Sequence, residues 1–495
     1  MSKLTTIRRI YSVFFFVLFL VLLFATDFRH LKGYETALFL ELSPLTFLAT
    51  LLSSFTVYKG IILSLLVIIP TVFLGRFFCS WICPMGILNQ WVSHIFNKRK
   101  NIDHNKINSY RSFFAFKYYL LTFLIVLAAF GSLQTGLFDP ISFLTRSFTI
   151  SMLPALNHSA ITMYLKQPIF SGGIIITLIF IAVMFSNRFL TRLWCRALCP
   201  LGALLGVISA FSPMRIRRDT KKCTDCRKCL KYCHGACDPH AALRQSECHL
   251  CMTCIEECPE GALHYGLKNQ QSSDQMPLDV NRRRIVETAL ATTVLFPMMK
   301  SAVNARTLDT ASVIRPPGSI PEGDFLRRCI KCGECMRVCP TNVLQPALFE
   351  AGLEGLWSPV LINKIGYCEH NCVLCGHVCP TGAIMPLTVE KKIKTKIGTA
   401  FYNRGRCLPW AMNIECIVCE EVCPTSPKAI WFQNTELTMR DGSTKILKRP
   451  FIDTKHCIGC GICQNKCPVH DSPAVYITSI GEHRSKTNQM ILKAN

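Results

Sequence analysis

Long apolar runs, separated by short polar segments, dominate the chain before residue 190. They contain almost no charged residues, and each approaches the ~20 residues that a ~30 Å hydrocarbon core requires. A further apolar stretch, Thr36–Tyr58, contains Glu41 and Pro44, so we expect a re-entrant or interfacial segment on the outer side. The pattern predicts an α-helical membrane domain with about four transmembrane helices, at Ile10–Thr26, Gly60–Leu74, Phe114–Phe130 and Pro168–Phe185.

Basic residues flank these runs unequally. Three of them precede the first run, and the stretch 76–117 carries seven Lys and Arg against one acid, whereas the stretch 131–167 carries only two basic residues. Loops that stay in the cytoplasm carry the excess of Lys and Arg. We therefore expect the N-terminus, residues 76–113 and the segment just after 186 in the cytoplasm.

The membrane unit repeats once along the chain. Residues 75–86 (GRFFCSWICPMG) and 191–202 (TRLWCRALCPLG) both follow an apolar run, and both contain Arg-x2-Cys-x3-Cys-Pro-x-Gly. Such self-similarity predicts two related helical hairpins, with both Cys pairs at the same cytoplasmic face. Three interpretations stay open: packed or disulfide-capable thiols, a shared four-thiolate site for an iron–sulfur centre or a copper-like soft metal, or a thiol–disulfide relay. These four cysteines are Cys79, Cys83, Cys195 and Cys199.

The other cysteines are spaced for clusters. The chain has 29 Cys, and 29 − 4 leaves 25, which form six groups of four plus Cys237. Three thiolates on a tight loop, with a fourth that usually precedes Pro, are typical of a [4Fe–4S] cluster, whereas a zinc site needs only two C-x-x-C pairs. We predict six [4Fe–4S] clusters with these ligands: Cys223, Cys226, Cys229 and Cys233; Cys248, Cys251, Cys254 and Cys258; Cys329, Cys332, Cys335 and Cys339; Cys368, Cys372, Cys375 and Cys379; Cys407, Cys416, Cys419 and Cys423; Cys457, Cys460, Cys463 and Cys467.

In such motifs the fourth Cys ligates the neighbouring cluster. We expect Cys258 to complete the first cluster and Cys233 the second, although Cys237 is an alternative to Cys233. In the last unit a nested pairing, first group with fourth and second with third, stays open. We predict α+β ferredoxin-like modules in this order: the membrane domain 1–212, a two-cluster ferredoxin domain 213–268, a linker 269–321 with a twin-arginine-like signal or anchor helix at 282–305, and a four-cluster domain 322–495.

Several classes of cofactor and ligand are not expected. None of the six groups contains C-x-x-C-H, and the four apolar runs contain no His, so neither a c-type haem nor a bis-His haem in the bilayer is predicted. Electrons that cross the membrane then need a quinone, or a centre at the four C-x3-C-P cysteines. The net charge is +24, but basic residues flank apolar runs rather than a base-reading helix, so we expect no nucleic acid partner. No acid–base pair or activated nucleophile is visible, so catalytic residues stay unassigned.

Two families resemble parts of the chain. Residues 1 to about 268 resemble NapH-type membrane quinol dehydrogenase subunits, which share the C-x3-C-P core with NosR and the accessory protein CcoG. Residues from about 282 onward resemble NapG/MauM-type ferredoxins, in Arg282-Arg283-Arg284 before an apolar run and in the stretched spacings at Cys368 and Cys407. The fusion of the two, and the His after Cys233 in place of Pro, depart from these families.

The resemblance implies a protein of the bacterial inner membrane whose last domain is periplasmic. It would pass electrons between the quinone pool and a periplasmic reductase or cytochrome subunit, as a quinol dehydrogenase or an electron-transfer subunit of an oxidoreductase. Two alternatives stay open. One is a CcoG-like assembly factor that reduces copper or a cofactor. The other is an all-cytoplasmic ferredoxin–quinone oxidoreductase, which requires that Ile285–Met299 does not cross the membrane.

Overall fold

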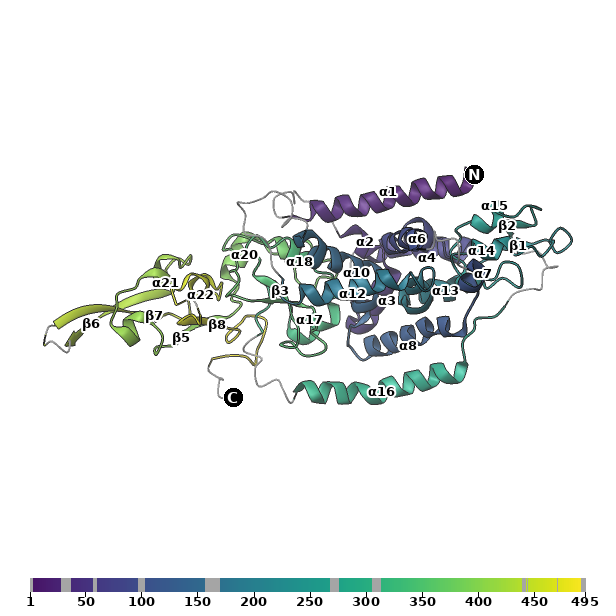
Figure 1. The fold of residues 1–495 in the computed structure, drawn as a ribbon. Helices are drawn as coiled ribbons and strands as arrows, with labels where there is room; N and C mark the ends of the chain where they lie inside the picture. Colours follow the sequence, from purple (N-terminus) through teal and green to yellow (C-terminus); the bar gives the residue numbers. More distant parts are fainter. Residues whose placement is uncertain are drawn as a thin grey trace.

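Three parts follow one another along an elongated molecule (Figure 1). A central helical part separates a small Cys-rich unit near the N-terminus of the first helix from a larger Cys-rich unit at the opposite end. Residues 269–275 and 305–312 of the predicted linker lie outside the described residues. The computed structural model describes residues 3–27, 37–56, 60–96, 103–155, 170–267, 276–304, 313–438, 442, 444–469 and 471–490.

Each of the four predicted apolar runs is largely helical where it is described. Only Leu4–Ala25 and His104–Ala129 are long and apolar enough to cross a membrane among the described residues, so a count of about four transmembrane helices is not confirmed. The second and fourth runs form shorter helices, and the fourth begins at Gly173 instead of Pro168. The helices are α1 (Lys3–Ala25), α4 (Gly60–Leu74), η1 (Ser112–Ala115) with α8 (Phe116–Ala129), and α12 (Gly173–Ser186).

Short helices fill the space between the long ones. Their order is the same in both halves and supports the sequence repeat. In each half a short helix precedes an apolar helix, and the apolar helix leads into a C-x3-C-P turn. A second short helix then begins at the Pro of that turn, Pro84 in the first half and Pro200 in the second. The segment predicted as re-entrant forms the short helices α2 and α3, apart from residues 36, 57 and 58, which are not described. The first half contains α2 (Leu38–Glu41), α3 (Pro44–Ser54), α5 (Phe78–Trp81) and α6 (Pro84–Phe96); α7 (His104–Asn108) links the halves; the second contains α9 (Thr135–Phe138), α10 (Pro140–Ser147), η2 (Phe148–Met152), η3 (Trp194–Leu198) and α13 (Pro200–Ser209).

Residues 214–267 form a small ferredoxin-like unit. Its two strands pair antiparallel, with Ile216 opposite Tyr265. The Trp81 indole N–H donates to the Leu250 carbonyl at 3.0 Å, and the Tyr265 hydroxyl donates to the Leu74 carbonyl at 2.7 Å, so the unit is docked on the first C-x3-C-P turn. The elements are β1 (Met214–Arg218), α14 (Lys228–Lys231), η4 (Gln245–Glu247), α15 (Thr253–Glu256) and β2 (Leu263–Leu267).

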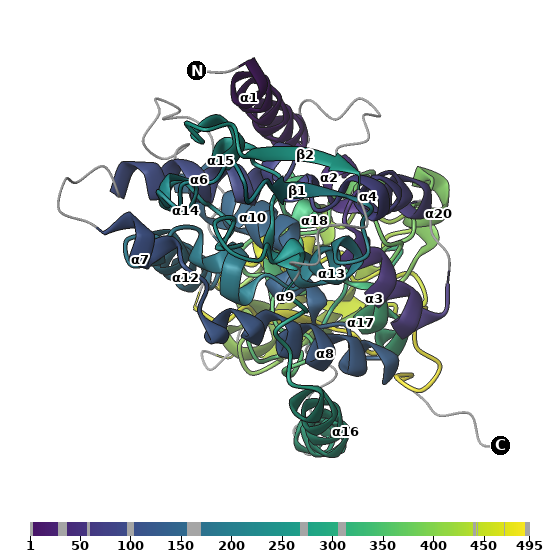
Figure 2. The ribbon, with the colours of Figure 1, turned by 90° about the vertical axis from the view of Figure 1, so that its right-hand side faces the viewer.

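A long helix, α16 (Arg282–Asn304), connects the two Cys-rich units. It lies against α8, and the two helices run in the same direction. The Asn281 N–H donates to the Tyr119 hydroxyl at 3.2 Å near one end, and the Phe296 ring stacks on Phe130 at 5.1 Å near the other. Figure 2 shows α16 and α1 on opposite sides of the helical part. By length and composition α16 is not among the candidate spans in the described residues.

The larger unit contains two short antiparallel strand pairs and an extended hairpin at its far tip (Figure 1). Strand β3 (Leu344–Pro346) pairs with β4 (Pro359–Leu361), and β5 (Thr399–Tyr402) pairs with β8 (Val475–Thr478). The hairpin consists of β6 (Ile430–Thr438) and β7 (Thr444–Ile452). The helices are α17 (Glu322–Arg328), α18 (Glu334–Arg337), α19 (Leu374–His377), α20 (Val389–Lys394), η6 (Leu408–Met412), α21 (Val418–Glu421) and α22 (Ile462–Lys466).

Glu322 fastens the start of this unit to its last segment. Its carboxylate accepts from Arg315 Nη2 at 2.6 Å and from Arg484 Nη1 at 2.5 Å. Burial alone would raise the pKa of Glu322, but the two guanidinium groups outweigh it and hold the pKa at about 2. The carboxylate is therefore ionised at neutral pH, and the ion pairs hold residues 313–322 in place.

Candidate iron–sulfur sites and C-x3-C-P cysteines

Four cysteines of the small unit surround a hollow of about 360 Å³: Cys223, Cys226, Cys229 and Cys258 line it. This is the pairing expected from the sequence. Cys254 lies close enough to Cys248, Cys251 and Cys233 for their charges to interact, so the second expected set also gathers in space.

Local backbone geometry explains how four of the six motifs curl around a common centre. In four groups the residues just before and just after the second Cys have positive φ, for example Lys331 at 57° and Gly333 at 88°. This left-handed backbone turns successive residues inward around one centre. Glycine adopts positive φ without strain, and Gly459 and Gly461 occupy both positions in the last group.

The larger unit has three comparable hollows. Their volumes are about 370, 350 and 340 Å³. Cys379 completes the remaining set, since its charge interacts with those of Cys329, Cys332 and Cys335. The lining sets are Cys339 with Cys368, Cys372 and Cys375; Cys467 with Cys407, Cys416 and Cys419; and Cys423 with Cys457, Cys460 and Cys463.

The fourth Cys of each group is therefore exchanged with the adjacent group. The first group pairs with the second and the third with the fourth, so the nested pairing is wrong. Neighbouring groups meet because β3–β4 and β5–β8 each close a separate half of the unit. That tertiary arrangement is invisible in the Cys spacing.

The donor sets fit [4Fe–4S] clusters better than single ions. Among the described residues, no three His, Cys, Asp or Glu side chains lie close enough together to hold one metal ion. In a [4Fe–4S] cluster each thiolate binds a different iron, so four separated sulfur atoms around a hollow are what the group requires. Burial raises the pKa of Cys329 and Cys419 to about 11, so these thiols must lose a proton when iron binds.

Cys237 stands beside Cys233, with their sulfur atoms 3.4 Å apart. Both cysteines are buried, and the charge of Cys237 also interacts with that of Cys248. The structure thus brings both candidate ligands to the same cluster site. The C-x2-C-x2-C-x3-C spacing still favours Cys233.

We expect Cys233→Ala to remove about four iron atoms per chain, the content of one cluster, and Cys237→Ala to leave the iron content unchanged. The Cys233 sulfur would be the ligand, and the Cys237 thiol a neighbour. Iron analysis of the two anaerobically purified variants measures the difference. If Cys237→Ala loses the iron and Cys233→Ala keeps it, the roles are reversed.

The four C-x3-C-P cysteines are all buried and converge from the two halves of the helical part. Cys199 lies close enough to Cys195, Cys79 and Cys83 for their charges to interact. The Arg76 Nε–H donates to the Cys79 sulfur at 3.3 Å, and the Gly202 N–H donates to the Cys199 sulfur at 3.2 Å. The four cysteines thus gather at one site, and their predicted position at the cytoplasmic face stays a prediction.

Asp139 has a structural role: its carboxylate accepts from the Ser142 N–H at 3.0 Å and so caps α10. Two buried cations were not predicted from the sequence: Lys117 is paired with Glu247, and Arg146 donates to the Lys331 carbonyl at 3.0 Å. A basic residue inside an otherwise apolar run is the one signal that could have indicated the first.

These sets of converging cysteines define a multi-cluster iron–sulfur protein of electron transport. Three family descriptions match: a 4Fe-4S binding domain at 56–103, 171–219 and 373–399, a 4Fe-4S dicluster domain at 247–344, and a further 4Fe-4S binding domain at 450–470. The prediction of iron–sulfur clusters is confirmed. No solved structure matches the chain.

Curated relatives identify the family more closely. The methylamine utilization ferredoxin-type protein MauM of Methylophilus methylotrophus is 31% identical over 38% of this chain and 81% of its own. The ferredoxin-type protein NapG of Escherichia coli is 30% identical over 33% of this chain and 69% of its own. The chain belongs to the family of NapG/MauM-type ferredoxins, as predicted for its second half.

A third relative is the "Putative electron transport protein YccM" of Escherichia coli, 33% identical over 39% of this chain. The match spans about half of that relative's length, 51%. The resemblance of residues 1 to about 268 to NapH-type subunits is not confirmed by these comparisons and stays a prediction.

Proposed function

We propose that this chain is a membrane-anchored electron-transfer protein that passes electrons between the quinone pool and a redox partner on the far side of the membrane. Six [4Fe–4S] clusters would carry the electrons one at a time, and the 24 cysteines of the six groups would hold them, with the fourth ligands exchanged as described. The observation that carries the proposal is the position of the helical part between the two Cys-rich units (Figure 1).

The surface of the helical part supports insertion into lipid. Large apolar side chains of α1, α4 and α12 point outward, among them Phe14 at 58%, Ile62 at 72% and Ile174 at 77% exposure. Polar side chains lie inside instead, including Arg8 and Lys117. Water-soluble proteins bury apolar groups and expose charges, whereas charged residues of membrane proteins face the bundle interior. The distribution favours a lipid environment.

The course of α16 supports a larger unit on the far side. Val286, Leu290 and Val294 form an exposed apolar stripe at helical spacing, and the helix follows α8 from the end that carries the small unit to the end that carries the larger one. Arg282, Arg283 and Arg284 precede the stripe, as positive-inside orientation requires. An all-cytoplasmic arrangement would leave this apolar stripe in water.

The residues around each hollow would determine the position and the reduction potential of its cluster. The cysteines set the position of each cluster, and backbone N–H groups donate to their sulfur atoms, for example from Ala262 to Cys258 at 3.3 Å and from Ala400 to Cys457 at 3.4 Å. Such hydrogen bonds raise the reduction potential of a cluster, and burial lowers its exposure to water. A quinol releases two electrons and two protons, and one-electron carriers divide the electron pair.

The test uses the anaerobically purified full-length protein and a menaquinol analogue. We expect the analogue to reduce the clusters, as seen by electron paramagnetic resonance, and the oxidised quinone to serve as the control that does not. A colourless, iron-free preparation would disprove the electron-transfer function. The orientation is tested separately: alkaline phosphatase fused after Asn495 should be active and green fluorescent protein dark, and the opposite result would place the larger unit in the cytoplasm.

A further inference from the structure

The centre of the helical part is built from the beginnings of four short helices. Helices α3, α10, α6 and α13 each start with Pro, preceded by Ser43, Asp139, Cys83 and Cys199. The Ser43 hydroxyl donates to Asp139 Oδ1 at 2.8 Å, which places the starts of α3 and α10 together. Asp139 also interacts electrostatically with Cys83. Helix N-termini carry partial positive charge, and half-helices that meet inside a membrane protein commonly surround a bound ion.

Two arginines, one from each repeat, add full positive charge at the same place. Arg76 and Arg192 are 1% and 0% exposed, and neither forms an ion pair with a carboxylate among the described side chains. The Nη2 of Arg76 and the Nη1 of Arg192 have no hydrogen-bond partner there. A buried guanidinium needs a compensating anion. Glu247 is near enough to interact with the charge of Arg76 but is paired with Lys117, so the two arginines predict a further negatively charged group between the repeats.

The glycine of each C-x3-C-P-x-Gly motif indicates where the negatively charged group would lie. A Cβ added at Gly202 would collide with Arg76 Nη2 and come within 3.3 Å of the Cys199 sulfur. A Cβ added at Gly86 would collide with the Cys79 carbonyl. The absence of side chains at these glycines thus lets the Arg76 guanidinium and both Cys-Pro turns approach one centre.

The sulfur atoms around this centre suit a cluster. Four thiolates provide the negative charge that the two arginines lack. Among the described residues, no three of these thiols lie close enough together to hold one ion, which agrees with a group in which different metal atoms take different thiolates.

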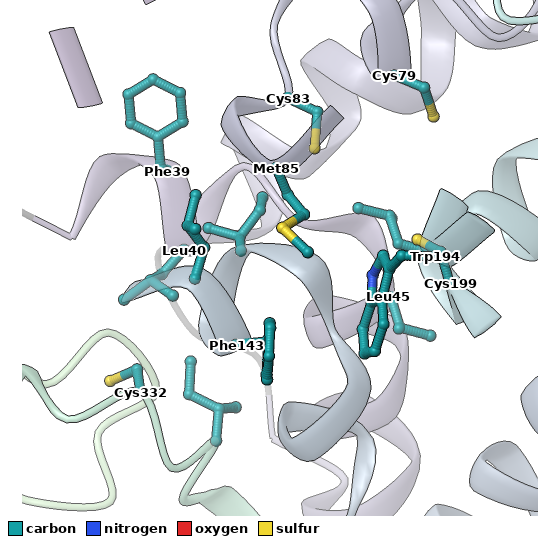
Figure 3. Close-up of a cluster of buried hydrophobic side chains, with 14 of the residues drawn as sticks. Phe39, Leu40, Leu45, Cys79, Cys83, Met85, Phe143, Trp194, Cys199 and Cys332 are labelled. Atoms are coloured by element: carbon teal, nitrogen blue, oxygen red, sulfur yellow. The ribbon is translucent and has the colours of Figure 1, made fainter. Parts of the chain in front are cut away.

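This centre also lies between the two Cys-rich units. Toward the small unit, Arg76 Nη1 donates to the Ser246 carbonyl at 3.0 Å, two residues before Cys248. Toward the larger unit, a continuous buried cluster includes Cys83, Cys199 and Cys332 (Figure 3). The same buried cluster contains Phe143 and Trp194, whose rings stack with centroids 5.0 Å apart and an interplanar angle of 19°.

We propose that Cys79, Cys83, Cys195 and Cys199 together hold a seventh iron–sulfur cluster, which relays electrons between the cluster at Cys248, Cys251 and Cys254 and the cluster at Cys329, Cys332 and Cys335. The inference rests on the proposed function and specifies its route. Each step moves one electron: the donor cluster is oxidised by one electron and the acceptor cluster is reduced by one. The two protons of the quinol leave where it is oxidised, and no covalent bond at the four cysteines changes.

Native mass spectrometry of the anaerobic wild-type protein, with iron analysis, tests the site. Six [4Fe–4S] clusters account for about 24 iron atoms per chain, and a seventh cluster raises this to about 26–28. We expect Cys83→Ser/Cys199→Ser to fall back to about 24, and Met85→Leu, in the same buried cluster, to keep the wild-type value. The wild-type mass alone decides whether the seventh cluster exists, so a variant that fails to fold leaves the test intact.

A wild-type protein with about 24 iron atoms, or with zinc or copper at this place, overturns the proposal. The relay has its own readout. In rapid-freeze electron paramagnetic resonance, reduction of the clusters in residues 322–495 by the menaquinol analogue should slow at least tenfold in the double variant and stay unchanged in Met85→Leu. Equal rates would overturn the relay. If the analogue reduces no cluster in the wild type while about 26–28 iron atoms are present, the proposed function fails and the seventh site stands.

Discussion

Arg146→Leu is expected to detach the larger Cys-rich unit from the helical part. Arg146 is fully buried and donates to the carbonyls of Gly136 at 3.2 Å, Leu137 at 3.3 Å and Lys331 at 3.0 Å. Its guanidinium also lies over the Trp357 ring, 4.4 Å from the centroid. Leucine would leave three carbonyls without a donor, at about 1–3 kcal/mol each, so we expect a total loss of at least about 3 kcal/mol.

Hydrogen exchange measures this loss directly. Amide groups of residues 329–337 should exchange faster in the Arg146→Leu protein, because the contact with η2 and α9 opens. Arg327→Ala is the matched control: its side chain is 45% exposed at the same junction, and exposed ion pairs contribute about 1 kcal/mol or less. Unchanged exchange in Arg146→Leu would show that other contacts, such as Lys331 Nζ to Gln134 Oε1 at 2.6 Å, are sufficient.

Cysteine spacing predicted the chemistry of the chain because a cluster places strict demands on local sequence. Three thiols on one loop need two turns of backbone between them, and those turns leave a motif that can be recognised in a single chain. Which distant Cys completes each cluster depends instead on how strands pair. Spacing therefore favoured Cys258 in the two-group unit, where only one neighbour exists, but could not decide among four groups.

Hydrophobic runs predicted the helices but not how they pack. The run at Gly60–Leu74 became a helix with the same bounds, since apolar length is a local property. The meeting of Ser43 with Asp139 and the placement of Arg76 against Ser246 join residues about a hundred or more positions apart. Such contacts come from tertiary packing of the two repeats, and only the shared Arg-x2-Cys-x3-Cys-Pro-x-Gly pattern indicated that a common centre exists.

The buried pair Lys117–Glu247 carries the second large expected effect, because it joins α8 to the small Cys-rich unit. The two side chains are 0% and 3% exposed, and the Tyr118 hydroxyl donates to Glu247 Oε1 at 2.9 Å. Lys117→Met would leave the buried carboxylate with the Tyr118 hydrogen bond and the weaker charge interaction with Arg76, and Glu247→Gln would leave a buried ammonium. Removal of one partner of a buried pair costs about 3–5 kcal/mol.

The double variant Lys117→Met/Glu247→Gln should be more stable than either single variant, because it buries no unpaired charge and the Gln carbonyl can still accept from Tyr118. A double-mutant cycle in chemical denaturation, followed by loss of cluster absorbance, should give a coupling energy of about 2–3 kcal/mol. Arg283→Ala serves as the control, since the Arg283–Glu287 pair is 86% and 56% exposed and should contribute about 0.5 kcal/mol or less. Strictly additive single effects would show that the Lys117–Glu247 pair does not act as a unit and that the small unit is held by its backbone contacts alone.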